Sequence, residues 1–207
     1  MKNVFQILDN RDRENSYIYD LQNGEKINLT LVLFCMRNTS LQIMVRLAEN
    51  AEFDGRVAII ASGTHEIFVD YLATHSGANS KSNFLVRGVL ANGIKKQTKM
   101  KISFRPSAIN AIGKENERIT LLDDSCQNIC MPIIESSEEN MKGSHGMSSG
   151  KINSDIYNYL ASRGLGDNQI RHLVARSDIL SILGNADENQ LQLISEKFDN
   201  FYEQNHV

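Results

Sequence analysis

The chain has 207 residues, of which 41% are hydrophobic and 23% charged, with a formal net charge of −3. A chain of this size and composition can bury a substantial core without disulfide or metal staples. It contains no long apolar run and no signal-peptide core, and its three cysteines fit a reducing compartment, so we expect a cytoplasmic protein that does not bind a membrane.

The first two thirds of the chain predict short β-strands. In the run Lys99–Arg105 apolar and polar side chains alternate, which places one face of the strand inward. No helical pattern separates the runs, which argues against a doubly wound α/β fold. Many short strands with few hairpin signals favour a β-helix, and a β-sandwich is the alternative. The predicted strands fall at 29–36, 41–48, 57–61, 66–73, 84–90, 99–105, 118–122 and 130–135.

The sequence changes in character after Gly150, where helical spacing replaces alternation. We therefore expect a β-helix core over residues 1–146 and a C-terminal helical region over 147–207. Three short helices bury little among themselves, so they must dock on the β part or on another protein. The first carries Ile156, Tyr159 and Leu160, the second carries Ile170, Leu173 and Val174, and the third spans about 188–202.

The distribution of charge and aromatic residues argues against two classes of function. Residues 81–105 hold seven basic side chains and no acidic one, but aromatics are sparse there, so we expect a solvated outer face and no nucleic-acid partner. Tryptophan is absent and aromatics make up only 7%, which disfavours a carbohydrate-active β-helix enzyme, an alternative that we keep. No nucleophile–base pair is legible.

Two cysteines could bear on metal binding. Cys126 and Cys130 lie four residues apart, and paired thiolates can hold zinc or an iron–sulfur cluster. Closed sites usually need four protein ligands, so the alternative is that both are buried as small hydrophobic side chains. The lone His65 and His75 are expected in exposed polar turns.

Several segments resemble the SufB/SufD family, and SufD in particular. Residues 142–152, Lys-Gly-Ser-His-Gly-Met-Ser-Ser-Gly-Lys-Ile, are similar to the SufD junction at which a Ser-His-Gly motif closes the β-helix. Residues 156–165 are similar to the helix that follows in the family, and 121–124 and 132–135 to its late strands. The spacing from Pro132 to His145 agrees without a gap, and the resemblance covers about 70–180.

The chain also departs from the family pattern. Gly143 stands where SufD often has a cysteine, and Gly146 stands where SufB has a glutamate. No cysteine occurs around 117–120, where SufB keeps its functional thiol. The residue at 146 makes the junction SufD-like and not SufB-like. We find no counterpart of the N-terminal helical region of full-length members, so we expect a minimal or divergent member of the family.

The resemblance implies a right-handed parallel β-helix with a helical tail, acting in iron–sulfur cluster assembly and not as an enzyme. It implies pairing with a SufB-like β-helix, or with itself as a homodimer, through the last strands around 118–135. It also implies that the helices carrying Ile156 and Leu173 bind a SufC-like ATPase. His145 is the candidate iron or cluster ligand, with Cys126, Cys130 and Glu135 as weaker candidates, for a transient cluster and no tightly bound cofactor. The alternative is a structural homodimer without a metal role.

Overall fold

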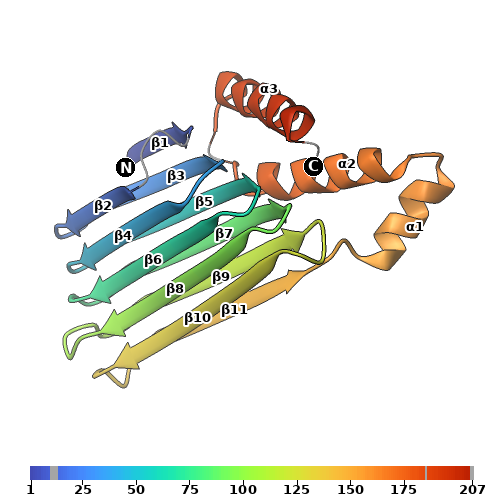
Figure 1. Ribbon diagram of the computed structural model, residues 1–207. Coiled ribbons are helices and arrows are strands. Elements are labelled where there is room, and N and C mark those ends of the chain that lie inside the picture. Colours follow the sequence, from blue (N-terminus) through green and yellow to red (C-terminus); the bar gives the residue numbers. More distant parts are fainter. Residues whose placement is uncertain (10–13, 185, 206–207) are drawn as a thin grey trace.

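The computed structural model describes residues 1–9, 14–184 and 186–205, which form eleven strands and three helices (Figure 1). The strands are β1 (Lys2–Leu8), β2 (Glu14–Leu21), β3 (Lys26–Cys35), β4 (Thr39–Leu47), β5 (Glu52–Ser62), β6 (Glu66–His75), β7 (Lys81–Ala91), β8 (Lys95–Phe104), β9 (Ile112–Leu121), β10 (Gln127–Ser136) and β11 (Lys142–Gly150). The helices are α1 (Ser154–Ser162), α2 (Asp167–Leu180) and α3 (Glu188–Gln204).

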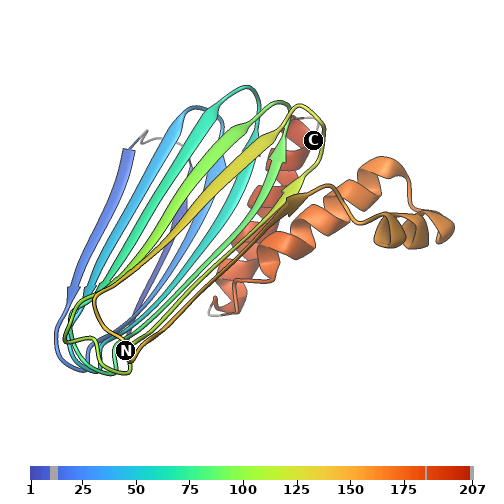
Figure 2. The same cartoon turned by 90° about the horizontal axis from the view of Figure 1, so that it is seen from below.

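The strands alternate between two parallel sheets. Odd-numbered strands form one sheet in the order β1-β3-β5-β7-β9-β11, and even-numbered strands form the other in the order β10-β8-β6-β4-β2. Consecutive strands therefore lie in opposite sheets, and each pairs with the strand one coil away, through about five turns (Figure 2). This confirms the predicted parallel β-helix, and it excludes a sandwich of hairpin-connected strands.

The length of a coil changes along the chain. Lys2 pairs with Ile27, 25 residues later, whereas Lys81 pairs with Ile112, 31 residues later, and Lys95 pairs with Gln127, 32 residues later. The strand pairing absorbs these differences because each corner can lengthen without disturbing the ladder. The drift explains why the sequence shows no repeat of fixed period.

One corner of the coil is built from residues with left-handed backbone conformation. Gly24, Asn50, Asn79 and Asn110 all have positive φ angles and occupy the same position in successive coils. Each donates its backbone N–H to a carbonyl of the next coil, from Gly24 to Glu49 at 2.9 Å through to Asn110 at 2.6 Å from Asn140. Glycine and asparagine tolerate this conformation best, which accounts for the residues found there.

The lumen between the sheets is packed with apolar side chains over most of its length. Fully buried leucine, isoleucine and valine residues fill the N-terminal coils, and a stack of aromatic rings crosses the middle. The rings of Tyr71 and Phe84 lie 3.9 Å apart and nearly parallel. Offset aromatic packing of this kind adds to the burial energy of the lumen.

A second apolar cluster joins α2 and α3 to the outer face of the odd-numbered sheet. Val32, Ala58 and Ile60 on the strands meet Ile179 and Phe198 on the helices. The C-terminal halves of these strands are thus buried on both faces, which is why they contain unbroken apolar runs. The predicted docking of the helices on the β part is confirmed for α2 and α3, which lie on one side of the solenoid in Figure 2.

Helix α1 extends away from this packed region. Asn153 caps it by accepting hydrogen bonds from the backbone of Asp155 and Ile156, and none of its residues is buried. In Figures 1 and 2 it projects from the solenoid as an arm beyond α2. None of the helices in the described ranges has the length and apolar character that crossing a membrane requires.

The free edges at the C-terminal end coincide only in part with the expected range of 118–135. Strand β9 pairs with both β7 and β11, so the residues from 118 to 121 are interior to a sheet. The edge strands are β10 and β11, and β11 continues to Gly150, past the expected boundary at 146. Strand β11 has no apolar alternation that would have predicted it, because its inward side faces the open end of the lumen.

The prediction that His75 is exposed is wrong. The side chain is fully buried and stacks on Phe104 with 4.8 Å between ring centroids. Its two ring nitrogens lie 2.8 Å from the hydroxyl of Ser80 and 2.9 Å from that of Ser82. Burial lowers the pKa of His75 to about 4, so the ring is neutral.

Candidate functional site

At the C-terminal end of the lumen, buried polar side chains lie beside a small apolar cluster that includes Phe104 and Ile134. A β-carbon at Gly143 would lie 3.2 Å from Ile134 and 3.3 Å from Phe104, so position 143 faces inward. Alternation along β11 then directs His145 inward as well. We name the inward-facing set Glu115, Glu117, Asn128, Cys130 and His145 the C-terminal mouth. It is open because no further coil covers β10 and β11.

His145 lies on the edge strand of this mouth. It pairs in register with Glu115 on β9, and its side chain is exposed. Because β11 is an edge strand, a second molecule docked on the C-terminal end of the solenoid could contact the inward-facing imidazole of His145. Neutral imidazole is a competent ligand for iron.

Glu115 is an acidic residue buried beside that histidine. Its side chain is only 2% exposed, and neither carboxyl oxygen has a hydrogen-bond partner among the described residues. Burial without compensation raises the pKa of Glu115 to about 8. The fold thus buries the carboxyl group of Glu115 while both of its oxygens remain available to form a hydrogen bond.

A fully paired ionic network lies next to it. The Nζ atom of Lys96 donates to Glu117 at 2.6 Å, to Asn128 at 3.2 Å and to the hydroxyl of Thr98. Asn128 in turn donates to the second oxygen of Glu117 at 2.9 Å. Both charged side chains are fully buried. Burial lowers the pKa of Lys96, and the Glu117 carboxylate opposes that shift.

Cys130 faces this network from β10. Its thiol is hydrogen-bonded to Glu117, and its pKa rises to about 12, mainly through burial and secondly through the charge of Glu117. The thiol is therefore protonated at neutral pH, whereas the thiolate is the form that binds metals. Cys130 lies at the mouth, but not in the state of a preformed metal ligand.

The other two weak candidates lie elsewhere. Cys126 is 6% exposed, and its sulfur lies 3.5 Å from the carboxylate of Asp123 at a corner of the coil. Glu135 is on the outer face of the even-numbered sheet, where it forms an ion pair with Lys101 at 2.7 Å. Across the ranges that the structure describes, no group of three or more His, Cys, Asp and Glu side chains could hold a metal ion.

The structure gives a packing reason for Gly143, where the resemblance would place a cysteine. The β-carbon contacts with Ile134 and Phe104 are tighter than most real contacts, so any side chain would require those neighbours to shift. On strands β9 and β11, the mouth of this chain thus has a glycine at 143 and the Glu115 carboxyl group near His145, and its one thiol is that of Cys130 on β10.

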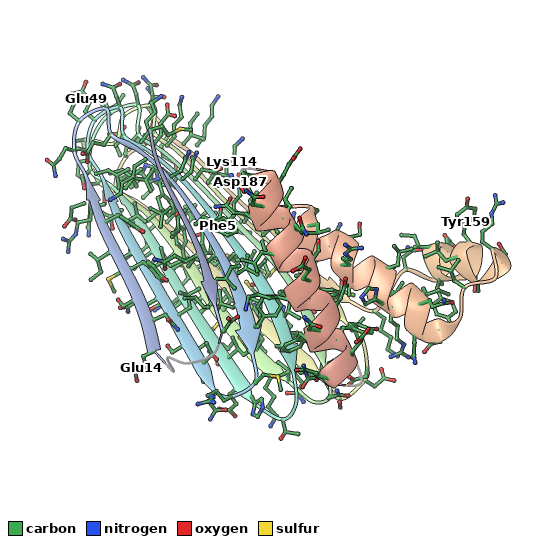
Figure 3. All side chains as sticks on the ribbon, turned by 90° about the horizontal axis from the view of Figure 1, so that it is seen from above. Phe5, Glu14, Glu49, Lys114, Tyr159 and Asp187 are labelled. Carbon is green, nitrogen blue, oxygen red and sulfur yellow. The ribbon has the colours of Figure 1, made fainter. Side chains whose placement is uncertain are left out.

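The expected ATPase-binding residues divide into exposed and buried groups. Ile156, Tyr159 and Leu173 are 50%, 57% and 45% exposed, and Figure 3 shows Tyr159 far out on the projecting arm. Leu160 and Val174 are half-buried. Ile170 is fully buried in α2, so it supports the helix and presents no surface. We name the exposed three, Ile156, Tyr159 and Leu173, the arm patch.

Sequence reasoning missed the polar interior of the mouth. Lys96 belongs to the basic segment expected on a solvated outer face, and it is instead among the most deeply buried side chains. The inward position of Glu115 and Glu117 also gave no signal, because β9 reads as polar on both faces up to Arg118. Their register with apolar residues of β7, such as Phe84 opposite Glu115, would have been the usable clue.

Comparison with known families identifies the fold. The family model described as the SufBD core domain of the SUF system of FeS cluster assembly matches residues 15–177, which covers most of the solenoid, α1 and much of α2. No curated protein matches the chain. The chain therefore belongs to the SufBD core family of the SUF system of iron–sulfur cluster assembly.

Proposed function

We propose that this protein is a SufD-like, non-enzymatic subunit of an iron–sulfur cluster assembly complex. It pairs through the free edges of β10 and β11 with a SufB-like β-helix or with a second copy, and it binds a SufC-like ATPase through the arm patch. The nascent cluster is cargo that forms at the mouth and leaves, so no cofactor is held tightly. The observation that carries the proposal is the position of His145, inward-facing, exposed and on the edge strand of the C-terminal mouth.

The ligand set of the mouth fits a shared site better than a closed one. His145 offers a nitrogen and Glu115 an oxygen, but the described residues contain no group of three ligands. A cluster needs about four ligands, so the remaining ones must come from the partner. Unpaired backbone groups along β10 and β11 favour pairing with another chain at this edge.

The cluster role is tested by His145→Ala in the assembled complex. The complex of this chain, its β-helix partner and the ATPase is reconstituted anaerobically with Fe²⁺ and sulfide, and iron and sulfide content and the UV–visible spectrum are measured. We expect the variant to assemble normally but to yield at least about fivefold less cluster, because a ligand is lost. His65→Ala is the matched control, since His65 lies in a turn at another corner. Equal yields from His145→Ala and wild type would support the structural homodimer instead.

The ATPase surface is tested by Tyr159→Asp combined with Leu173→Asp. Both side chains are exposed, so the fold should be retained while an apolar contact surface is lost. Leu193→Asp on α3 is the matched control, because Leu193 is 44% exposed and Leu173 is 45% exposed. We expect affinity for the ATPase to fall at least about tenfold in the double variant only, by titration calorimetry. Unchanged affinity with an unchanged melting temperature would contradict the assignment.

A further inference from the structure

Glu115 and His145 are lateral neighbours in the last parallel ladder. Their Cα atoms are in register between β9 and β11, and both side chains are directed to the lumen side. Adjacent strands lie about 4.8 Å apart, so in-register side chains on one face are within reach of each other. A glutamate carboxyl can therefore meet the neighbouring imidazole by a change of rotamer alone.

None of the other described neighbours of Glu115 makes a hydrogen bond to it. The hydroxyl of Tyr71, which is also unpartnered, lies close enough for the Glu115 charge to raise the pKa of Tyr71, and it is the competing donor. On the side away from His145 its register partner is Phe84, whose ring is stacked on Tyr71. The nearby ammonium group of Lys96 is committed to Glu117, Asn128 and Thr98. Both oxygens of Glu115 are buried and unpartnered among the described residues. A buried carboxyl group without any partner is costly, so an interaction at its open side is strongly favoured.

His145, in turn, needs a hydrogen-bond acceptor that would fix its orientation and tautomer. An exposed histidine on an edge strand can rotate and can carry its proton on either ring nitrogen. Histidines that ligate metals usually donate the other ring N–H to a carboxylate, which fixes both the orientation and the tautomer. Glu117 cannot serve here, because it pairs in register with Met147 and its oxygens are taken by Lys96 and Asn128.

We propose that Glu115 is the positioning residue for His145: one of its carboxyl oxygens accepts a hydrogen bond from the nearer ring N–H and leaves the other ring nitrogen as a free lone-pair donor at the mouth. The use of that free nitrogen as a ligand rests on the proposed function. The hydrogen bond between Glu115 and His145 does not rest on the proposed function, because it forms in the isolated protein without a partner or a cluster.

The hydrogen bond is tested by the tautomer of His145 in the metal-free protein. Long-range ¹H–¹⁵N NMR of ¹⁵N-histidine-labelled protein at pH 9 reports which ring nitrogen carries the proton. We expect one dominant tautomer in wild type and in Glu115→Gln, whose amide oxygen can still accept. Glu115→Met removes the acceptor at similar volume, and we expect the tautomer ratio to move by about fivefold, as for the loss of one hydrogen bond. Glu135→Gln, on the outer face, should change nothing.

Two results separate this inference from the proposed function. A tautomer ratio in Glu115→Met that equals the wild-type ratio, in a protein with native circular dichroism, overturns the role of Glu115 whatever His145→Ala does to cluster yield. A shifted ratio in Glu115→Met together with full cluster yield in His145→Ala upholds the hydrogen bond and overturns the ligand role of His145.

Discussion

The buried pair Lys96–Glu117 should dominate the stability of the C-terminal coils. Lys96→Met keeps the aliphatic stem but removes the ammonium group, which leaves the fully buried Glu117 with only the neutral donors Asn128 and Cys130. Removing one partner of a buried ion pair typically costs about 3–5 kcal/mol. We expect that loss for Lys96→Met and a similar one for Glu117→Leu, which strands the ammonium group.

The double variant Lys96→Met/Glu117→Leu should be less destabilised than the sum of the two single changes implies. It leaves no buried charge, and its main cost is the loss of the partners of the Thr98 hydroxyl and the Asn128 amide, about 2–4 kcal/mol together. With about 3–5 kcal/mol lost in each single variant, the coupling energy from the four proteins is then about 2–8 kcal/mol. Urea denaturation followed by circular dichroism gives each free energy of unfolding.

An exposed ion pair provides the control. Arg46 and Asp20 lie 3.2 Å apart, with 72% and 53% of their side chains exposed. Arg46→Met should change the free energy of unfolding by less than about 1 kcal/mol. The reasoning is refuted if Lys96→Met costs no more than Arg46→Met, or if the two buried substitutions prove additive.

Two further predictions concern titratable groups inside the lumen. The folded-state pKa of His75 is lowered from 6.5 to about 4, so its contribution to stability is complete above pH 6.5 and is lost as the pH falls to 4. The loss in the free energy of unfolding is about 2–3 kcal/mol in total. Urea denaturation across this pH range should show a shallower pH dependence for His75→Gln than for wild type, and parallel curves would contradict this. Because the pKa of Cys130 is raised to about 12, iodoacetamide at pH 8 should modify it at least about tenfold more slowly in native than in urea-unfolded protein, by peptide mass spectrometry; equal rates would show an ionised or fully accessible thiol.

The fold could be predicted for the strands whose inward-facing residues are apolar and alternate with polar outward-facing ones. Each of the eight apolar runs coincides with one strand to within one residue at its end, because inward alternation is enforced wherever a coil has neighbours on both sides. Strands β1, β2 and β11 lie in the terminal coils and were missed. Strand β11, with three glycines and three serines, has low strand propensity and forms through its ladder to β9. Tertiary pairing, which a local pattern does not contain, decides its structure.

Two members of the mouth, His145 and Cys130, were candidate ligands from the sequence. His145 was found through the family resemblance, and its inward position at the open end agrees with a binding role. Lys96, Glu115 and Glu117 were not found, because an inward polar residue has the same sequence appearance as an outward one. The register between coils decides whether a polar residue faces inward or outward, and this register depends on the lengths of the corners, which vary from coil to coil.

The lumen is filled by apolar side chains in the N-terminal coils and partly by polar ones in the C-terminal coils, which suggests a stabilising role for the first and a binding role for the second. The N-terminal coils are filled by side chains such as Leu29 and Ile43, and α2 and α3 cover their outer face, so this half supplies most of the burial energy. The C-terminal coils place Lys96, Glu115 and Glu117 where the same geometry would accept apolar residues, which would fold at lower cost. A solenoid selected for stability alone would continue the apolar filling to its last coil. The costly polar end is also the end with free strand edges and an exposed imidazole, and this coincidence points to the C-terminal mouth as the part of the molecule that acts on a partner.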